Sequence, residues 1–197
     1  MEKKIECLVT NKELMEDILV LAIDNGLIPK QLYNLEYDEY MLNLFETYLI
    51  ETDTKEYIRG LSFPSYITLN DDSVTLMEIL EEIHGFNLIQ YCYDNDIDIL
   101  IGLSIFSLLH EIGHIKVFHD ESLKMFNENK DELINEIIED DNMEFKEKQF
   151  AYRCVPSEFV ADRLAYTFMR VYEDKIINII NNINSFEYGK LTIETME

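Results

Sequence analysis

The sequence predicts an α+β fold that is mostly helical, with one small sheet beside a buried helix. Apolar residues recur at helical spacing along most of the chain, whereas only short β-prone runs are present. Residues 97–119 are apolar almost all round in their first half, which is typical of a helix in the middle of a domain. The length of 197 residues, 47% of them hydrophobic, favours one domain spanning 1–197 with its own core.

The first part of the chain, 1–60, is predicted to form a helical N-terminal extension. A short strand at 4–9 is followed by Thr10, which starts a capping box for a helix that ends at Gly26. A second helix is expected over 38–51, because its apolar residues lie three and four positions apart. The apolar face of this second helix would consist of Met41, Leu44, Phe45 and Tyr48.

One β-prone run lies among the helical segments of the remaining chain. It precedes a helix expected at 73–84 and is bounded by turn-forming residues. A later helix is expected over 157–178 with Ser157 as its cap. The polar, weakly patterned residues 185–197 are expected to form a frayed tail. The predicted strand consists of Tyr66, Ile67, Thr68 and Leu69.

The charge balance and the cysteines limit the functions open to this chain. There are 16 Lys and Arg against 40 Asp and Glu, which gives a net charge of -24. This charge repels phosphate backbones, so no direct nucleic-acid partner is expected. A basic protein partner fits the charge, and so does an acidic surface that imitates DNA. The 3 cysteines are too far apart for a disulfide framework or a cysteine-based zinc site.

The apolar runs are too short for a targeting signal or a membrane anchor. The run at 18–23 is shorter than the apolar part of a signal peptide. The longest run, at 99–109, falls well short of the roughly 20 residues that span a bilayer. We therefore expect a cytoplasmic protein with no membrane span.

The motif that carries chemistry lies within the predicted buried helix. His110 and His114 are four residues apart, so both imidazoles lie on one helical face and can reach a single ion. Glu111 follows the first histidine and would lie beside the open position of that metal, where it could take a proton from bound water. This HExxH pattern predicts a metal-dependent hydrolase in which Glu111 is the catalytic residue.

A catalytic zinc ion normally has three protein ligands, so one more is required. Glu158 is a candidate, because apolar neighbours flank it on a separate predicted helix and a buried carboxylate needs a cation. Asp162 lies one turn further on the same face and could accept the spare N–H of a ligand histidine. His119 and Asp120 are the alternatives, although Val117 stands where a sharp backbone turn would need glycine.

These residues resemble the gluzincin metallopeptidases. Residues 110–119, HEIGHIKVFH, match the pattern HExGHxxxxH of the HtpX branch, and residues 158–162, EFVAD, match its ExxAD pattern. The ImmA/IrrE branch is similar, with an apolar segment before HExGH and a later ExxAN or ExxAD, so both branches stay open. The resemblance covers only about 40 residues of the chain and does not identify a substrate.

The resemblance implies a zincin-like domain in which His110, His114 and Glu158 bind one Zn²⁺ ion. Glu111 would be the general base, and Asp162 would support a ligand histidine. The implied activity is hydrolysis of a peptide bond in a protein or peptide substrate through metal-activated water. The alternative is a non-catalytic acidic inhibitor or DNA mimic on the same scaffold.

Other residues are candidates for contacts to the substrate or to the oxyanion. Tyr152, Arg153 and Tyr166 are near Glu158 in the sequence. The β-prone run at 66–69 would offer an edge to which an extended peptide adds as a strand. The acidic, lysine-studded stretch 120–148 lies between the two ligand-bearing helices, so we predict that it forms a mobile flap over the cleft. His84, at a predicted helix end, is expected to be structural.

Overall fold

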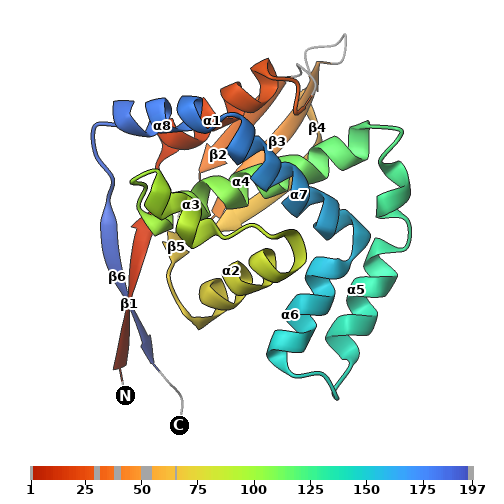
Figure 1. Cartoon of the computed structure of the whole chain (residues 1–197). Helices are drawn as coiled ribbons and strands as arrows, with labels where there is room; N and C mark the ends of the chain where they lie inside the picture. The colour runs from red at the N-terminus through yellow and green to blue at the C-terminus, as the bar shows by residue number, and fades with distance from the viewer. Residues whose placement is uncertain (1, 29–31, 38–40, 50–54, 65, 195–197) are drawn as a thin grey trace. The chain divides into compact units, whose positions relative to one another are not determined.

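The computed structural model divides the chain into two compact units, where the sequence predicted one domain. One unit comprises Met1–Thr68 and Asn178–Glu197, and the other comprises Leu69–Ile177. The fold is α+β and mostly helical, as predicted (Figure 1). The backbone is described for residues 2–28, 32–37, 41–49, 55–64 and 66–194, and side chains are described for 7–28 and 67–189.

The first unit contains a three-stranded antiparallel sheet with β1 (Glu2–Val9) in the middle. Strand β5 (Tyr66–Thr68) forms one edge, so the predicted strand is confirmed except for Leu69. Strand β6 (Tyr188–Glu194) forms the other edge. The expectation of a frayed tail was therefore wrong over β6. Backbone hydrogen bonds to β1 hold this segment as a strand, and its weak side-chain pattern gave no sign of that pairing.

A second antiparallel sheet has the order β2 (Leu32–Tyr37), β3 (Met41–Leu49) and β4 (Lys55–Pro64). The predicted helix over 38–51 is therefore wrong over Met41–Leu49, its other residues lie outside the described ones, and the described residues of the N-terminal extension are mostly strand. Short apolar runs fit either period, and this one contains Phe45, Thr47 and Tyr48, whose residue types are common in strands. As the central strand, β3 forms a backbone ladder on both edges, which decides the outcome in favour of the sheet.

The helix of the first unit is α1 (Lys12–Asp24). Its N-cap is Asn11, whose side chain accepts a hydrogen bond from the Leu14 backbone N–H at 2.9 Å. Thr10, the predicted cap, is instead buried one residue earlier. Asparagine is at least as good an N-cap as threonine, so the helix starts one residue later than the capping-box pattern suggested.

In the second unit, the structure describes only helices and their connections. Apart from the long helix α4 (Ile99–His119), they include the 3-10 helix η1 (Lys124–Asn127) and α8 (Glu173–Asn182), which crosses the boundary between the units. The remaining helices are α2 (Asp71–His84), α3 (Leu88–Asp94), α5 (Lys130–Glu139), α6 (Phe145–Cys154) and α7 (Pro156–Val171).

Helix α4 confirms the prediction of a buried helix. Asp98 caps it by accepting a hydrogen bond from the Leu100 N–H at 2.8 Å, and the helix ends at His119. It is long and apolar enough to cross a membrane, but 78% of its most apolar window is buried inside the protein. Such burial is typical of the core helix of a folded domain. Helix α7 packs along α4 and brings a second set of side chains to the same place.

The sequence predicted one helix over 157–178, whereas the structure has α7 and α8 with a break at Tyr172. Helix α7 begins at Pro156, and Ser157 is buried in its first turn instead of capping it. Proline fits the first helical position because that position needs no N–H donor.

The segment 120–148 is more ordered than a simple flap and contains η1, α5 and the start of α6. Helices α5 and α6 lie side by side as an antiparallel pair (Figure 1). No residue of η1, α5 or α6 is buried. The segment is thus held with little apolar burial, and its low local stability stays a prediction.

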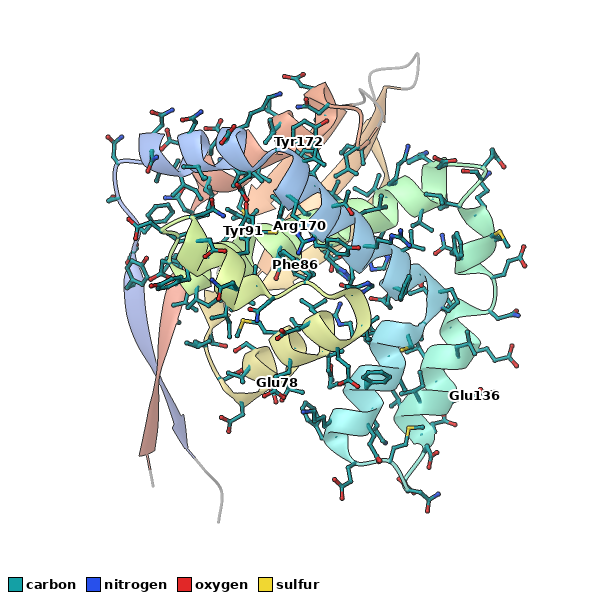
Figure 2. The ribbon with its side chains drawn as sticks, viewed as in Figure 1. Glu78, Phe86, Tyr91, Glu136, Arg170 and Tyr172 are labelled. Carbon is teal, nitrogen blue, oxygen red and sulfur yellow. The ribbon has the colours of Figure 1, made fainter. Side chains whose placement is uncertain are left out.

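Aromatic packing fixes the end of α2 against α7. Phe86, directly after α2, is buried and stacks on Tyr166 of α7 at 5.4 Å between ring centroids. The guanidinium of Arg170, also on α7, lies 5.5 Å from the centre of the Phe86 ring (Figure 2). These contacts hold His84, the last residue of α2, next to the helix that carries Glu158 and Asp162.

Candidate metal centre

Three predicted ligands converge in the second unit. The Nε2 atoms of His110 and His114 are 3.1 Å apart. Oxygen Oε2 of Glu158 lies 3.3 Å from the first of these nitrogens, and Oε1 lies 3.4 Å from the second. The three side chains therefore form a group that could hold a metal ion. From the sequence Glu158 was one of several candidates for the third ligand, and it is the one that the fold places in this group.

The helix crossing that creates this group depends on a glycine. At Gly113, between the two histidines, an added Cβ would lie 2.9 Å from Ala161 Cα and 3.0 Å from the Ala161 carbonyl oxygen. Real Cβ atoms hardly ever approach other atoms this closely. Glycine thus lets α7 approach α4 closely enough for Glu158, one turn before Ala161, to reach both imidazoles.

The carboxylate of Glu158 is the most demanding group of the site, because its side chain is 0% exposed. Neither oxygen has a hydrogen-bond donor in good geometry, and the neighbours that compensate the charge are nitrogen atoms of cationic or titratable side chains. Burial raises the pKa of Glu158, but His110 and His114 outweigh that effect and hold the pKa well below its usual range. A buried, ionised carboxylate next to two imidazoles fits a divalent cation.

Asp162 supports His110 from behind, as the sequence predicted. Its Oδ1 accepts a hydrogen bond from the Nδ1–H of His110 at 2.8 Å, which leaves Nε2 facing Glu158. Arg153 donates to the same oxygen at 3.0 Å, and His84 Nε2 lies 3.7 Å from Oδ2. Burial raises the pKa of Asp162, but these neighbours reverse the effect and lower it to about 2. The carboxylate is therefore ionised and orients the ring of His110.

The pKa of His110 is set by burial and by its hydrogen bonds to the same two carboxylates. Burial lowers this pKa, whereas the hydrogen bonds to Asp162 and Glu158 raise it, and the net result is a pKa of about 9. In the metal-free protein the imidazole is therefore protonated at neutral pH. A metal ion would have to displace that proton, because only the neutral ring is a ligand.

The other predicted site residues divide into those near the ligands and those elsewhere. Glu111 is partly exposed on α4, next to His110, and its charge contributes to a raised pKa of Tyr152. Burial is the main cause of that raised pKa, followed by the charge of Glu158, so the phenol of Tyr152 lies near the ligand carboxylate. Tyr152 therefore keeps its candidate role at the site.

Arg153 and Tyr166 have other partners. Arg153 pairs with Asp162, so it positions the support of His110. The ring of Tyr166 packs at 5.5 Å from that of His84, within the aromatic cluster at the end of α2. The expectation that these two residues contact an oxyanion or a substrate finds no support in their placement.

The alternative third ligands lie outside the group. The carboxylate of Asp120 pairs with Lys116 at 3.2 Å and accepts hydrogen bonds from Ser122. His119 packs its ring edge-on against Phe118 at 5.1 Å between centroids. The predicted substrate strand, 66–69, falls mainly in the other unit, with Leu69 at the boundary.

Two residues of the site were missed or underrated by sequence reasoning. Lys130, at the start of α5, places Nζ 2.8 Å from Oε1 of Glu158. Lys130 is far from the motif along the chain, so the sequence did not indicate this contact. His84 was predicted to be structural, and it packs against Phe159 and lies beside Asp162. Its proximity to a helix end was no guide to that contact, which depends on how α2 and α7 pack.

Comparison of the chain with protein families, with characterised proteins and with solved structures finds no match. The resemblance to gluzincins therefore rests on the motif residues, and the geometry of His110, His114 and Glu158 stands as independent support for a metal site.

Proposed function

We propose that this protein is a zinc-dependent metallopeptidase, with His110, His114 and Glu158 as the ligands of one zinc ion. The observation that carries the proposal is the spacing of the ligand atoms: the two imidazole nitrogens lie 3.1 Å apart, and each lies 3.3 or 3.4 Å from a different oxygen of Glu158. A tetrahedral ion with bonds of about 2.0–2.1 Å holds its ligand atoms about 3.3 Å apart. The ligand atoms therefore already have the spacing that zinc requires.

The donor set favours zinc over other common cations. Two imidazoles and one carboxylate suit zinc, whereas magnesium and calcium prefer sites built from oxygen ligands. Three protein ligands leave one coordination position open, which is typical of catalytic rather than structural zinc. The unsatisfied, fully buried oxygens of Glu158 supply the negative charge that such an ion would neutralise.

When bound, zinc supplies a Lewis acid that polarises a peptide carbonyl and makes water acidic. Glu111 is next to His110 and partly exposed, so its carboxylate can accept the proton of the attacking water. The same carboxylate then returns this proton to the leaving amine. The raised pKa of Tyr152 keeps its phenol protonated at neutral pH, so Tyr152 Oη can donate a hydrogen bond to the developing oxyanion.

The substrate class follows from the surface charge and from the chemistry of the site. We infer a protein or peptide substrate, and the net charge of -24 favours a basic one. The same charge disfavours direct binding of nucleic acid. The burial of α4 supports a core helix rather than a membrane span, and we propose a cytoplasmic location.

Substituting Glu111 tests the proposal. The Glu111→Gln variant should keep one zinc ion per chain, because Glu111 is not a ligand, and should lose about 10²- to 10⁴-fold in hydrolysis rate. Zinc content is measured by elemental mass spectrometry, and hydrolysis with a library of quenched fluorescent peptides rich in lysine and arginine.

Two ligand-site variants serve as controls. Glu158→Ala should lose both zinc and hydrolysis, whereas His119→Ala should keep both. Zinc retained by Glu158→Ala, or full hydrolysis by Glu111→Gln, would contradict the proposed roles. An acidic inhibitor or DNA mimic on this scaffold would need neither residue, so an unchanged biological effect in both variants would favour that alternative.

A further inference from the structure

A lysine from α5 lies at the proposed metal site. Nζ of Lys130 is 2.8 Å from Oε1 of Glu158, the same oxygen that lies 3.4 Å from Nε2 of His114. The side chain of Lys130 is 28% exposed, so the ammonium reaches inward from the surface to a carboxylate that is fully buried.

This ammonium group carries part of the role that the proposed function gives to zinc. A buried carboxylate without a cation is strongly destabilised, and Lys130 is one of the cations beside Glu158, together with the protonated His110. Zinc would bind within about 2.0–2.2 Å of a Glu158 oxygen. The ammonium and the ion would then lie only a few ångströms apart, where their like charges repel each other. Occupation by Lys130 and occupation by zinc therefore oppose each other.

Except for this contact, helix α5 is only weakly held in place. It has no buried residue, and its N-cap, Asn129, has a positive φ of 58° and makes no side-chain capping hydrogen bond. A lysine at the first helical position is also unfavourable beside the positive end of the helix dipole. Moving the start of α5 away from Glu158 thus exposes little apolar surface and breaks no capping contact of a side chain.

From these contacts we propose that Lys130 is an internal cation that closes the metal-free site, and that zinc binding expels it and releases the start of α5. This inference rests on the proposed function, because it assigns a regulation to the same site. It makes zinc loading and the position of α5 two coupled states of the molecule. Metal-free protein would then hold the ammonium of Lys130 at Glu158, and zinc-loaded protein would not.

The coupling predicts the direction in which zinc affinity changes. Lys130→Met and Lys130→Gln remove the competing charge, so each should bind zinc about tenfold or more tightly than the unaltered protein, the usual size of such a coupling. Lys130→Arg keeps the charge and should bind zinc as the unaltered protein does. Lys146→Met is the matched control, because Lys146 forms a 2.7 Å ion pair with Glu78 on the surface, and it should leave zinc affinity unchanged.

Two measurements on the chelator-stripped full chain test this. Dissociation constants come from zinc titrations in a competing chelator, and the fold of each variant is checked by circular dichroism. Hydrogen exchange is then followed in α5 with and without zinc. In the unaltered protein zinc should speed exchange at the start of α5, whereas in Lys130→Met exchange there should be fast already without zinc.

The outcomes separate this inference from the proposed function. If both Lys130→Met and Lys130→Gln bind zinc as tightly as the unaltered protein or more weakly, this inference is overturned. That result is expected if Lys130 supports Glu158 while zinc is bound. If zinc binds in a manner that needs His110 and Glu158, the metallopeptidase proposal survives such a result. If the unaltered protein binds no zinc, the proposed function and this inference both fail.

Discussion

Asp162 is the residue at which four helices of the second unit meet. It lies on α7, accepts a hydrogen bond from His110 of α4, and has His84 of α2 at 3.7 Å. Arg153 of α6 completes the set with a contact of 3.0 Å. One buried carboxylate thereby orients a ligand histidine and joins the helices that surround it.

Replacing this carboxylate should weaken metal binding without removing a ligand. Asp162→Ala should lower zinc affinity about 10- to 100-fold, the usual size of losing such a support. Asp162→Asn can still accept the His110 hydrogen bond, so its loss should be smaller. Zinc titrations of both variants provide the measurement, with Asp174→Ala, an exposed aspartate on α8, as the control. Affinities equal to that of the unaltered protein would make Asp162 a structural residue only.

At this scale the sequence predicted the residues that form the candidate metal group better than it predicted their electrostatic surroundings. The spacing of His110 and His114 follows from helix geometry, and the pattern around Glu158 indicated a second ligand-bearing helix. The contacts of Lys130 and His84 could not be predicted in this way. They join residues that are far apart in the chain, and only the packing of α2, α5 and α7 brings them to Glu158 and Asp162.

At the scale of elements, the crossing of α4 and α7 determines whether the ligands meet. The closest approach is at Gly113, where backbone atoms of Ala161 fill the space that a side chain would need. The pattern HExGH therefore includes a packing requirement along with its chemical one. A similar close approach occurs at Gly102, but there the neighbour is the flexible side chain of Cys92 on α3.

Adding one methyl group at this crossing should push the two helices apart. Gly113→Ala should destabilise the protein by about 1–3 kcal/mol, as overpacking usually does, and should also weaken zinc binding. Urea unfolding and zinc titration measure the two effects. Gly102→Ala should destabilise without a comparable loss of zinc affinity, because Cys92 is remote from the ligands. Ala161→Gly should not rescue Gly113→Ala, because the closest obstacles are backbone atoms. Unchanged zinc affinity in Gly113→Ala would refute this role of the crossing.

A helix or strand could be predicted when its own residues determine its conformation. Helix α4 and the end of α2 at Gly85, whose φ of 64° suits glycine, were predicted from their own residues. Strands β3 and β6 were missed because they owe their conformation to partner strands. Residues 41–49 have a spacing that fits either a helix or a strand, and pairing with both neighbours decides between them.

At the scale of the whole molecule, the candidate site belongs to one unit. Every contact described above for His110, His114, Glu158 and Asp162 lies within Leu69–Ile177. Metal binding should therefore act on the stability of this unit directly. It should also depend on pH, because protons compete with zinc for His110.

The sign of the pH dependence follows from the raised pKa of His110. In the metal-free fold this pKa is about 9, above the ordinary value of 6.5. The protonated imidazole therefore stabilises the fold fully below about pH 6.5, and this contribution is lost as the pH rises through 9. Zinc binds the neutral ring, so its affinity should rise over the same interval, by up to about tenfold per pH unit.

The difference in melting temperature between zinc-loaded and metal-free protein should thus grow from pH 6.5 to 9. Both changes have one cause, the proton on His110, which stabilises the metal-free form at lower pH and competes there with zinc. Thermal unfolding in chelator-buffered zinc at several pH values, paired with fully chelated samples, measures this difference. His110→Ala removes the titrating ligand and should abolish both the zinc-induced increase and its pH dependence. A zinc-induced increase that stays constant from pH 6.5 to 9 would mean that His110 loses no proton when the metal binds, and would remove it from the ligand set.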